Sequence, residues 1–186
     1  MTLDKLIPKD TLIIAALERE LPKTLLPNWN IVYSGVGKVN ASFSVVNAYN
    51  TFKPKVIINY GTAGSLNENL NGLIPINIFK QRDMDVRPLG FEMGETPYDK
   101  INSITLDYEG YSCGTGDNFV IGKQKLETDI VDMESYPIAK FCLLNNISFF
   151  CYKYISDNAN KDAAIDWELN IQKGADLFVK YINNFI

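Results

Sequence analysis

The sequence predicts a three-layer α/β domain in which helices cover both faces of a central sheet. Strand-like and helix-like segments alternate along the chain, and several strands are continuous apolar runs of the kind that is buried on both faces. No internal repeat, low-complexity tract or linker interrupts the 186 residues. We therefore expect a single domain over residues 1–186.

The first half of the chain predicts three strands and one helix. Residues 11–17 form an apolar run, residues 30–34 a shorter strand, and residues 55–59 a third strand that is again apolar. Apolar residues at helical spacing predict a helix over 41–52, and Pro54 closes it because proline cannot continue a helix. This order of strands and helix is the alternation that indicates the fold class.

The second half of the chain is less regular in its middle. Residues 81–99 combine prolines and glycines within a short stretch and predict no regular element. The other expected elements are strands at 73–80, 104–106, 108–113, 129–133 and 148–155, and helices at 135–145 and about 164–183. The last helix is amphipathic, so one of its faces should pack on the sheet.

The chain contains no histidine, and this absence excludes several kinds of active site. Ser-His-Asp and Cys-His catalysis both need an imidazole, as do zinc sites built on histidine. Cys142 and Cys151 lie in apolar stretches and are interpreted as small buried hydrophobes. We expect no metal and no catalytic thiol, so carboxylates become the first candidates for proton transfer.

Charge and hydropathy exclude two classes of partner. The formal net charge is −4 and no lysine-rich run occurs, so we expect no nucleic-acid partner. No segment reaches the roughly 20 consecutive apolar residues of a membrane helix, so we expect no membrane contact. The apolar run at 11–17 is too short and wrongly flanked for a signal peptide, which favours a cytoplasmic protein.

Four polar clusters fall at the ends of predicted strands. They lie at residues 18–20, 61–64, 133–134 and 156–157. Ligands of open α/β sheets bind at the carboxyl ends of the strands. Polar residues also begin wherever a strand ends, so one such cluster means little, but four together indicate a binding site.

Three carboxylates in these clusters are candidates for chemistry. Asp157 follows an apolar strand, where burial would raise its pKa and suit it to donate a proton, although its Ser-Asp-Asn context equally favours a turn cap. Glu20 could activate a water, but composition does not separate it from Glu18, and either could simply be the acid of a first helical turn. Glu134 could accept sugar hydroxyls, or could be another helix N-terminal acid.

Two glycine-containing segments could bind an anion or a sugar. Residues 35–40, Gly-Val-Gly-Lys-Val-Asn, resemble a phosphate loop only superficially, because the third glycine and the hydroxyl residue of the known motifs are missing. Residues 61–64, Gly-Thr-Ala-Gly, offer backbone amides and one hydroxyl to an anion, a water or a sugar oxygen.

Taken in order, these segments resemble the nucleoside phosphorylase superfamily, and most closely the 5′-methylthioadenosine/S-adenosylhomocysteine nucleosidases. The similar motifs are IAALERE at 14–20, SGVGKVN at 34–40, INYGTAG at 58–64, GDNFV at 116–120, VDME at 131–134 and ISDNA at 155–159. They span almost the whole chain. The resemblance implies a three-layer α/β/α sandwich with a mixed sheet, a homodimer and a place in methionine salvage.

The resemblance also implies a role for each matching residue in cleaving a purine nucleoside. Glu20 would activate the attacking water, and Asp157 would protonate the purine at N7 with help from Ser156. The remaining positions would contact the substrate: Met133 and Glu134 the ribose, Phe119 and Val120 the base, and Thr62 and Gly64 the water and sugar. This chemistry needs neither a metal nor a diffusible cofactor.

Two other functions remain open from the sequence. A phosphorylase must hold a phosphate dianion, usually with arginine, and the chain has only Arg19, Arg82 and Arg87, none of them directly before the segment at 61–64. A non-catalytic nucleoside-binding protein is the other alternative, although all three carboxylates are present.

Three departures from the family pattern leave the 5′ substituent of the sugar undecided. The segments before Gly61 and before Phe119 are short for the family, and Lys153 stands where related nucleosidases often have arginine. The segment 85–97 is similar to the family's loop near the 5′ group. Its apolar residues Phe91, Met93 and Pro97 would suit a thioether or could be ordinary packing residues.

Overall fold

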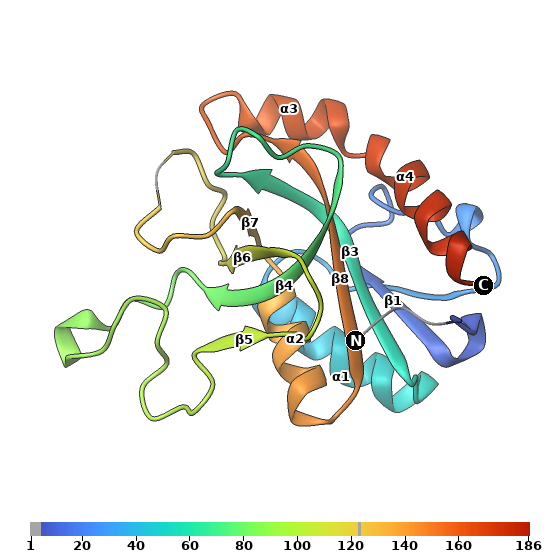
Figure 1. Cartoon of the computed structure of the whole chain (residues 1–186), viewed down its shortest axis with the longest axis horizontal. Helices are drawn as coiled ribbons and strands as arrows, with labels where there is room; N and C mark the ends of the chain where they lie inside the picture. The colour runs from blue at the N-terminus through green and yellow to red at the C-terminus, as the bar shows by residue number, and fades with distance from the viewer. Residues whose placement is uncertain (1–4, 123) are drawn as a thin grey trace.

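The computed structural model describes residues 5–122 and 124–186, and within them it contains one mixed sheet of eight strands (Figure 1). The strands are β1 (Thr11–Ala15), β2 (Asn30–Tyr33), β3 (Val56–Ser65), β4 (Leu73–Gln81), β5 (Ser103–Thr105), β6 (Tyr111–Thr115), β7 (Ile130–Asp132) and β8 (Ser148–Asp157). The helices are α1 (Lys38–Phe52), α2 (Ser135–Leu144), α3 (Ala163–Asn170) and α4 (Lys173–Ile182). Short 3-10 turns lie at Pro8–Asp10, Lys23–Leu25, Arg87–Leu89 and Asn183–Phe185.

The sheet is mixed, because β3 pairs parallel with β1 and β8 but antiparallel with β7, and the sheet partly closes on itself. Strands β2, β1, β3 and β8 run parallel to one another. The C-terminal end of β3 also pairs with β7, which continues through β6 and β4 back to β8. Strand β3 can serve both parts because it is ten residues long, and its first half pairs with β1.

Strand β1 is buried on both faces, as its apolar sequence predicts. Leu12 and Ile14 pack in the core under α1 and α2, whereas Ile13 and Ala15 pack in the core with α4. Figure 1 shows α1 and α2 on one side of the sheet and α3 and α4 on the other. The predicted α/β fold with helices on both faces of a mixed sheet is therefore confirmed.

Helix α1 begins three residues earlier than its apolar spacing predicts. Its N-cap is Gly37, with φ of 95°, a conformation that side chains with a Cβ rarely adopt. Lys38 and the next two residues therefore form the first helical turn rather than a loop. At the other end Lys53 is left-handed and Pro54 follows, in agreement with the predicted stop.

The predicted final helix is in fact two helices. The helix is interrupted at residues 171–172, between α3 and α4. The break has a packing reason: Ala175, Phe178 and Ile182 of α4 cover the sheet, whereas α3 extends over the end of β8. One straight helix of this length would not follow both surfaces of the twisted sheet.

Several strand boundaries also differ from the predictions, those of β3, β6 and β8 among them. Strand β3 continues through the Gly-Thr-Ala-Gly segment to Ser65, and β8 continues to Asp157. Strand β6 is Tyr111–Thr115, displaced towards the C-terminus from the predicted 108–113. These extensions arise from pairing with distant strands, which local composition does not report.

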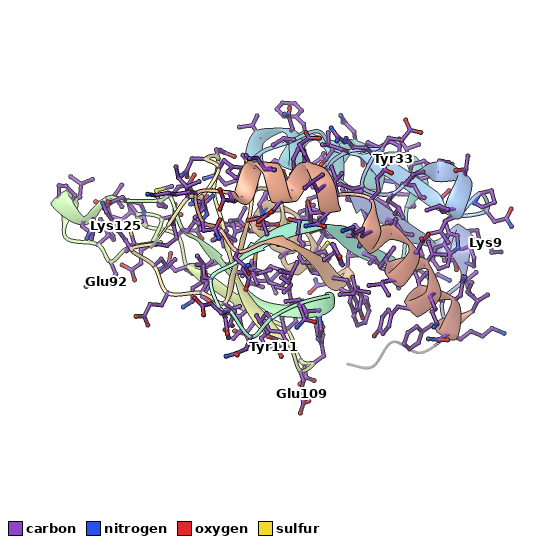
Figure 2. All side chains as sticks on the ribbon, turned by 90° about the horizontal axis from the view of Figure 1, so that it is seen from above. Lys9, Tyr33, Glu92, Glu109, Tyr111 and Lys125 are labelled. Carbon is purple, nitrogen blue, oxygen red and sulfur yellow. The ribbon has the colours of Figure 1, made fainter. Side chains whose placement is uncertain are left out.

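The irregular segment between β4 and β5 projects from the body of the molecule (Figure 1). In Figure 2, Glu92 of this segment and Lys125 both lie towards one end of the molecule, and Lys9 lies at the opposite end. Among the described residues, no helix has the length and apolar character needed to cross a membrane.

Candidate active site

A cavity of about 190 Å³ opens where the ends of β3, β7 and β8 meet the segment after β1. Its lining includes all nine residues that the sequence predicts to form the site, namely Glu20, Thr62, Gly64, Phe119, Val120, Met133, Glu134, Ser156 and Asp157. They come from five separate segments of the chain. The fold thus brings the four polar clusters to one place.

Glu20 is buried at the cavity, whereas Glu18 is exposed. The Glu20 carboxylate is held by three donors. Its Oε1 accepts hydrogen bonds from the Thr62 amide at 2.9 Å and the Thr62 hydroxyl at 2.7 Å, and its Oε2 accepts one from the Leu17 amide at 3.0 Å. This arrangement fixes the carboxylate against β3 and leaves its cavity side free to face a water.

Trp167 of α3 extends the hydrogen bonds around Glu20. Its indole N–H donates to the Thr62 hydroxyl at 2.9 Å, and its ring lines the cavity. The Arg19 guanidinium lies 5.3 Å from the centre of that ring and pairs with Glu168, which ties α3 to the segment after β1. Helix α3 therefore forms one wall of the site.

Glu134 lies at the N-terminal end of α2 and accepts a hydrogen bond at 2.9 Å from the amide of Gly37. Burial, together with the nearby Asp132 carboxylate, raises the pKa of Glu134 to about 7. One carboxyl oxygen is engaged by Gly37, and the group lines the cavity. It is therefore placed to accept hydrogen bonds from a ligand's hydroxyls.

A buried ion pair lies behind Glu134. The Lys153 ammonium contacts Asp132 at 2.9 Å, and both side chains are almost fully buried. Although burial alone would raise the pKa of Asp132, Lys153 and two hydrogen bonds, from the Thr115 hydroxyl and the Ser135 amide, hold it below its usual range. Lys153 thus balances the charge of Asp132 beneath the cavity.

Asp157 ends β8 and faces the cavity beside Gly64. Its Oδ2 accepts a hydrogen bond from the Ser156 hydroxyl at 2.8 Å, and its Oδ1 accepts one from the Ala159 amide at 2.9 Å. Burial nevertheless raises the pKa of Asp157 above its ordinary value. A carboxyl group with a raised pKa is suited to donate a proton.

Substituting Gly64 by alanine should disturb Asp157 directly. A Cβ at this position would lie 2.8 Å from the Asp157 Oδ1 and 3.3 Å from the Ala159 side chain. We expect Gly64→Ala to cost about 1–3 kcal/mol of unfolding free energy and to lower kcat more than KM rises. Gly61→Ala on the same strand is the comparison, because its Cβ would lie 3.4 Å from the Glu20 Oε1 and from the Lys153 Nζ, an ordinary contact distance that displaces neither group. Thermal melts and steady-state kinetics of both variants would check this, and equal kinetics would contradict it.

Phe119 and Val120 lie on the loop after β6. Phe119 is 47% exposed at the mouth of the cavity, whereas Val120 is buried. Arg82, at the end of β4, lies under this loop and donates to the carbonyl oxygen of Asn118 at 2.5 Å. The loop is therefore held from below, and the Phe119 ring is the accessible part.

Several residues at or beside the cavity were not predicted from the sequence. Arg82, Asn118, Asp132 and Trp167 line the cavity, and Lys153 is buried behind it. Trp167 is 105 residues from its partner Thr62, so no local pattern pointed to it. For Lys153, a charged residue within an apolar strand was a usable signal.

Within the single chain, the segment after β4 lies apart from the cavity. None of Phe91, Met93 and Pro97 lines the cavity in this chain, because the segment projects away from the body. Phe91 instead packs edge-on against Tyr98 at 5.8 Å. Among residues 5–122 and 124–186, no three His, Cys, Asp or Glu side chains are grouped so as to hold a metal ion.

Comparison with known proteins assigns the chain to a family. The model of the phosphorylase superfamily matches residues 28–112. A 5′-methylthioadenosine/S-adenosylhomocysteine nucleosidase from Staphylococcus aureus is 31% identical over 171 aligned positions, and the match covers 78% of this chain and 75% of that relative. The chain belongs to this nucleosidase family. The resemblance seen in the six sequence motifs is thus confirmed.

Solved structures of this nucleosidase family share the fold. A Helicobacter pylori 5′-methylthioadenosine/S-adenosylhomocysteine nucleosidase mutant with 5′-methylthioadenosine in its active site superposes with a TM-score of 0.84 at 21% identity, covering 96% of this chain and 98% of that one. A futalosine hydrolase mutant from the same organism gives 0.83 at 20% identity, covering 94% and 97%. At these identities the likeness establishes the fold.

Proposed function

We propose that this chain hydrolyses the N-glycosidic bond of a purine nucleoside, 5′-methylthioadenosine or S-adenosylhomocysteine, and releases adenine. The observation that carries the proposal is the convergence of Glu20, Glu134 and Asp157 on one cavity, each in a different hydrogen-bonding environment. The names of its curated relatives support the same substrates.

The three carboxylates divide the work of cleaving the bond. Departure of a purine leaves positive, oxocarbenium-like character on the ribose, as in glycoside hydrolysis. Asp157 donates a proton to N7 of the leaving base, assisted by Ser156. Glu20 orients and deprotonates the attacking water, and Glu134 binds the ribose hydroxyls while its charge stabilises the cationic sugar.

The remaining cavity residues position the substrate. Phe119 stacks on the purine, and the main chain of Val120 contacts the edge of the base. Met133 packs against the ribose. Thr62 and Gly64 lie beside the water and sugar, and the hydrogen bonds of Thr62 to Glu20 support this assignment.

Water is favoured over phosphate as the attacking group. The three arginines have other partners: Arg19 pairs with Glu168, Arg87 with Asp85, and Arg82 with carbonyl and amide oxygens. Lys38, the lysine of the phosphate-loop-like segment, pairs with Asp83 at 2.6 Å. A buried carboxylate at Glu20 would also repel a phosphate dianion.

Incubating the purified protein with four nucleosides would test the proposed reaction. The panel is methylthioadenosine, S-adenosylhomocysteine, adenosine and inosine, each with and without phosphate. We expect adenine release from a 5′-thio nucleoside that does not depend on phosphate. Release only with phosphate would identify a phosphorylase, and no release from any nucleoside would favour a non-catalytic nucleoside-binding protein.

The pH dependence of kcat/KM should show the titration of Glu134. Below its pKa of about 7 this group is protonated in the free enzyme and loses acceptor capacity for the ribose hydroxyls. We expect kcat/KM to fall about tenfold per pH unit on that acidic side. Profiles of kcat/KM from pH 5 to 9 would measure this fall. The Glu134→Gln variant should have a lower kcat/KM at every pH and should not show the fall below pH 7. If the variant shows the same fall, another group is responsible for it.

We also propose that two copies associate through the outer face of α1 and α2. Val39, Phe43 and Val46 are exposed on α1, and Leu144 is exposed on the neighbouring α2, beside an apolar groove. An apolar surface of this kind is typical of an interface. Light scattering should give a dimer, and Phe43→Asp should shift it towards the monomer. A monomeric wild-type chain would refute the proposal.

The cytoplasmic location and the place in methionine salvage stay predictions.

A further inference from the structure

Arg82 is buried beneath the loop that carries Phe119 and Val120, and it makes four hydrogen bonds to the chain around that loop. Its Nε donates to the carbonyl of Gly114 at 3.1 Å, and its Nη2 donates to the carbonyls of Gly116 at 3.1 Å and Asn118 at 2.5 Å. Its Nη1 donates to the Asn118 side-chain oxygen at 2.7 Å. One rigid guanidinium therefore binds the carbonyl oxygens of every second residue from 114 to 118, and also the side-chain amide oxygen of Asn118.

The backbone leaves space for this guanidinium. A Cβ at Gly116 would lie 2.8 Å from the Arg82 Cζ, and a Cβ at Gly114 would lie 3.2 Å from the Arg82 Cβ. The Gly-Thr-Gly sequence at the end of β6 thus leaves room for the Arg82 side chain, and only 4% of the surface of this residue is exposed. Burial lowers the pKa of Arg82, and the nearby Asp83 and Asp132 charges oppose that shift.

The direct hydrogen-bond partners of Arg82 are neutral oxygens of the chain. Asp83, the adjacent carboxylate, is bound instead by the Lys38 ammonium and the Asp117 amide. The Arg82 guanidinium thus makes its hydrogen bonds to the end of β6 and to the loop that follows it. Burying a cation in this way is costly unless its donors are satisfied, so the loop conformation is strongly coupled to this side chain.

We propose that Arg82 is a positioning residue that fixes the purine-binding loop of the site through Asn118. The bonded carbonyl and side chain of Asn118 directly precede Phe119 and Val120, and both Arg82 and Asn118 line the cavity. On the sugar side of the site, Gly37 donates to Glu134 and Thr62 donates to Glu20, and within the described part of the chain Arg82 has no hydrogen bond to any of these four residues. Arg82 therefore acts more strongly on the affinity for the base than on the affinity for the sugar, whose side of the site the loop reaches through the bond between the Asp117 carboxylate and the Lys38 amide. This inference rests on the proposed function of the cavity.

The two reaction products separate these affinities. Adenine probes the base side and 5-methylthioribose the sugar side, and titration calorimetry measures the binding of each without turnover. In Arg82→Lys, which keeps the charge but not the planar fork, we expect adenine to bind about tenfold or more weakly, with 5-methylthioribose within about threefold. Asn118→Ala should weaken adenine in the same direction by less, and it remains informative if Arg82→Lys folds poorly.

Arg87→Lys is the matched control, because Arg87 is a half-exposed arginine that pairs with Asp85 on the projecting segment. It should bind both products as the wild type does. Equal weakening of both products in the Arg82 and Asn118 variants, or a lower melting temperature with unchanged binding, would overturn the inference. If the wild type binds adenine but releases none from any nucleoside, the proposed hydrolysis fails while the role of Arg82 is still tested.

Discussion

Replacing Asp157 by asparagine should lower kcat for nucleoside hydrolysis by about 10²–10⁴-fold, the usual worth of general acid catalysis. Asparagine keeps the shape of the side chain and can still accept the Ala159 amide, so the fold should remain. It cannot give a proton to N7, and the purine would have to leave as an anion. Adenine release and thermal melting would measure the two effects separately.

Asp166→Asn is the control for charge near Asp157. The Asp166 carboxylate contributes to the raised pKa of Asp157, but it does not line the cavity. Its replacement should leave kcat within a few-fold of the wild type. Near-normal turnover in Asp157→Asn would remove Asp157 from the mechanism, whatever the control shows.

Glu20→Gln should also lower kcat by about 10²–10⁴-fold, because an amide cannot take a proton from the attacking water. The Thr62 donors can still bind the Gln oxygen, whereas its NH₂ would meet the Leu17 amide, two donors facing each other. We therefore expect a modest loss of stability in addition to the loss of rate. KM should change little, since the water rather than the nucleoside depends on this group.

Glu18→Gln provides the matched comparison two residues away. Glu18 is exposed and lies outside the cavity, so its variant should retain wild-type kinetics. Pre-steady-state and steady-state adenine release would compare the pair. Equal activities of the two variants would show that Glu20 does not activate the water.

The sequence alone predicted most of the architecture, because apolar periodicity is a local property. The run at 11–17 indicated a strand buried on both faces, and Leu12 and Ile13 do face opposite cores. Boundaries that depend on long-range pairing were less predictable. Strand β3 reaches Ser65 because its end pairs with β7, and the last helix breaks at 171–172 because its halves pack on different surfaces.

By itself the sequence also determined the family and the class of chemistry. Six ordered motifs indicated a nucleosidase, and the absence of histidine left carboxylates as the first candidates for the acid and the base. These properties can be read from residue types and their order, since a motif keeps its spacing whatever the rest of the chain does.

Only the tertiary structure decided which side chains share the cavity. Glu18 and Glu20 are equivalent in composition, but burial and the Thr62 donors distinguish Glu20. Arg82 and Trp167 reach the site across long sequence separations, and Phe91 is carried away from it. The physical reason is that proximity in a folded chain depends on strand pairing and helix packing between distant segments, which no local pattern of residues specifies.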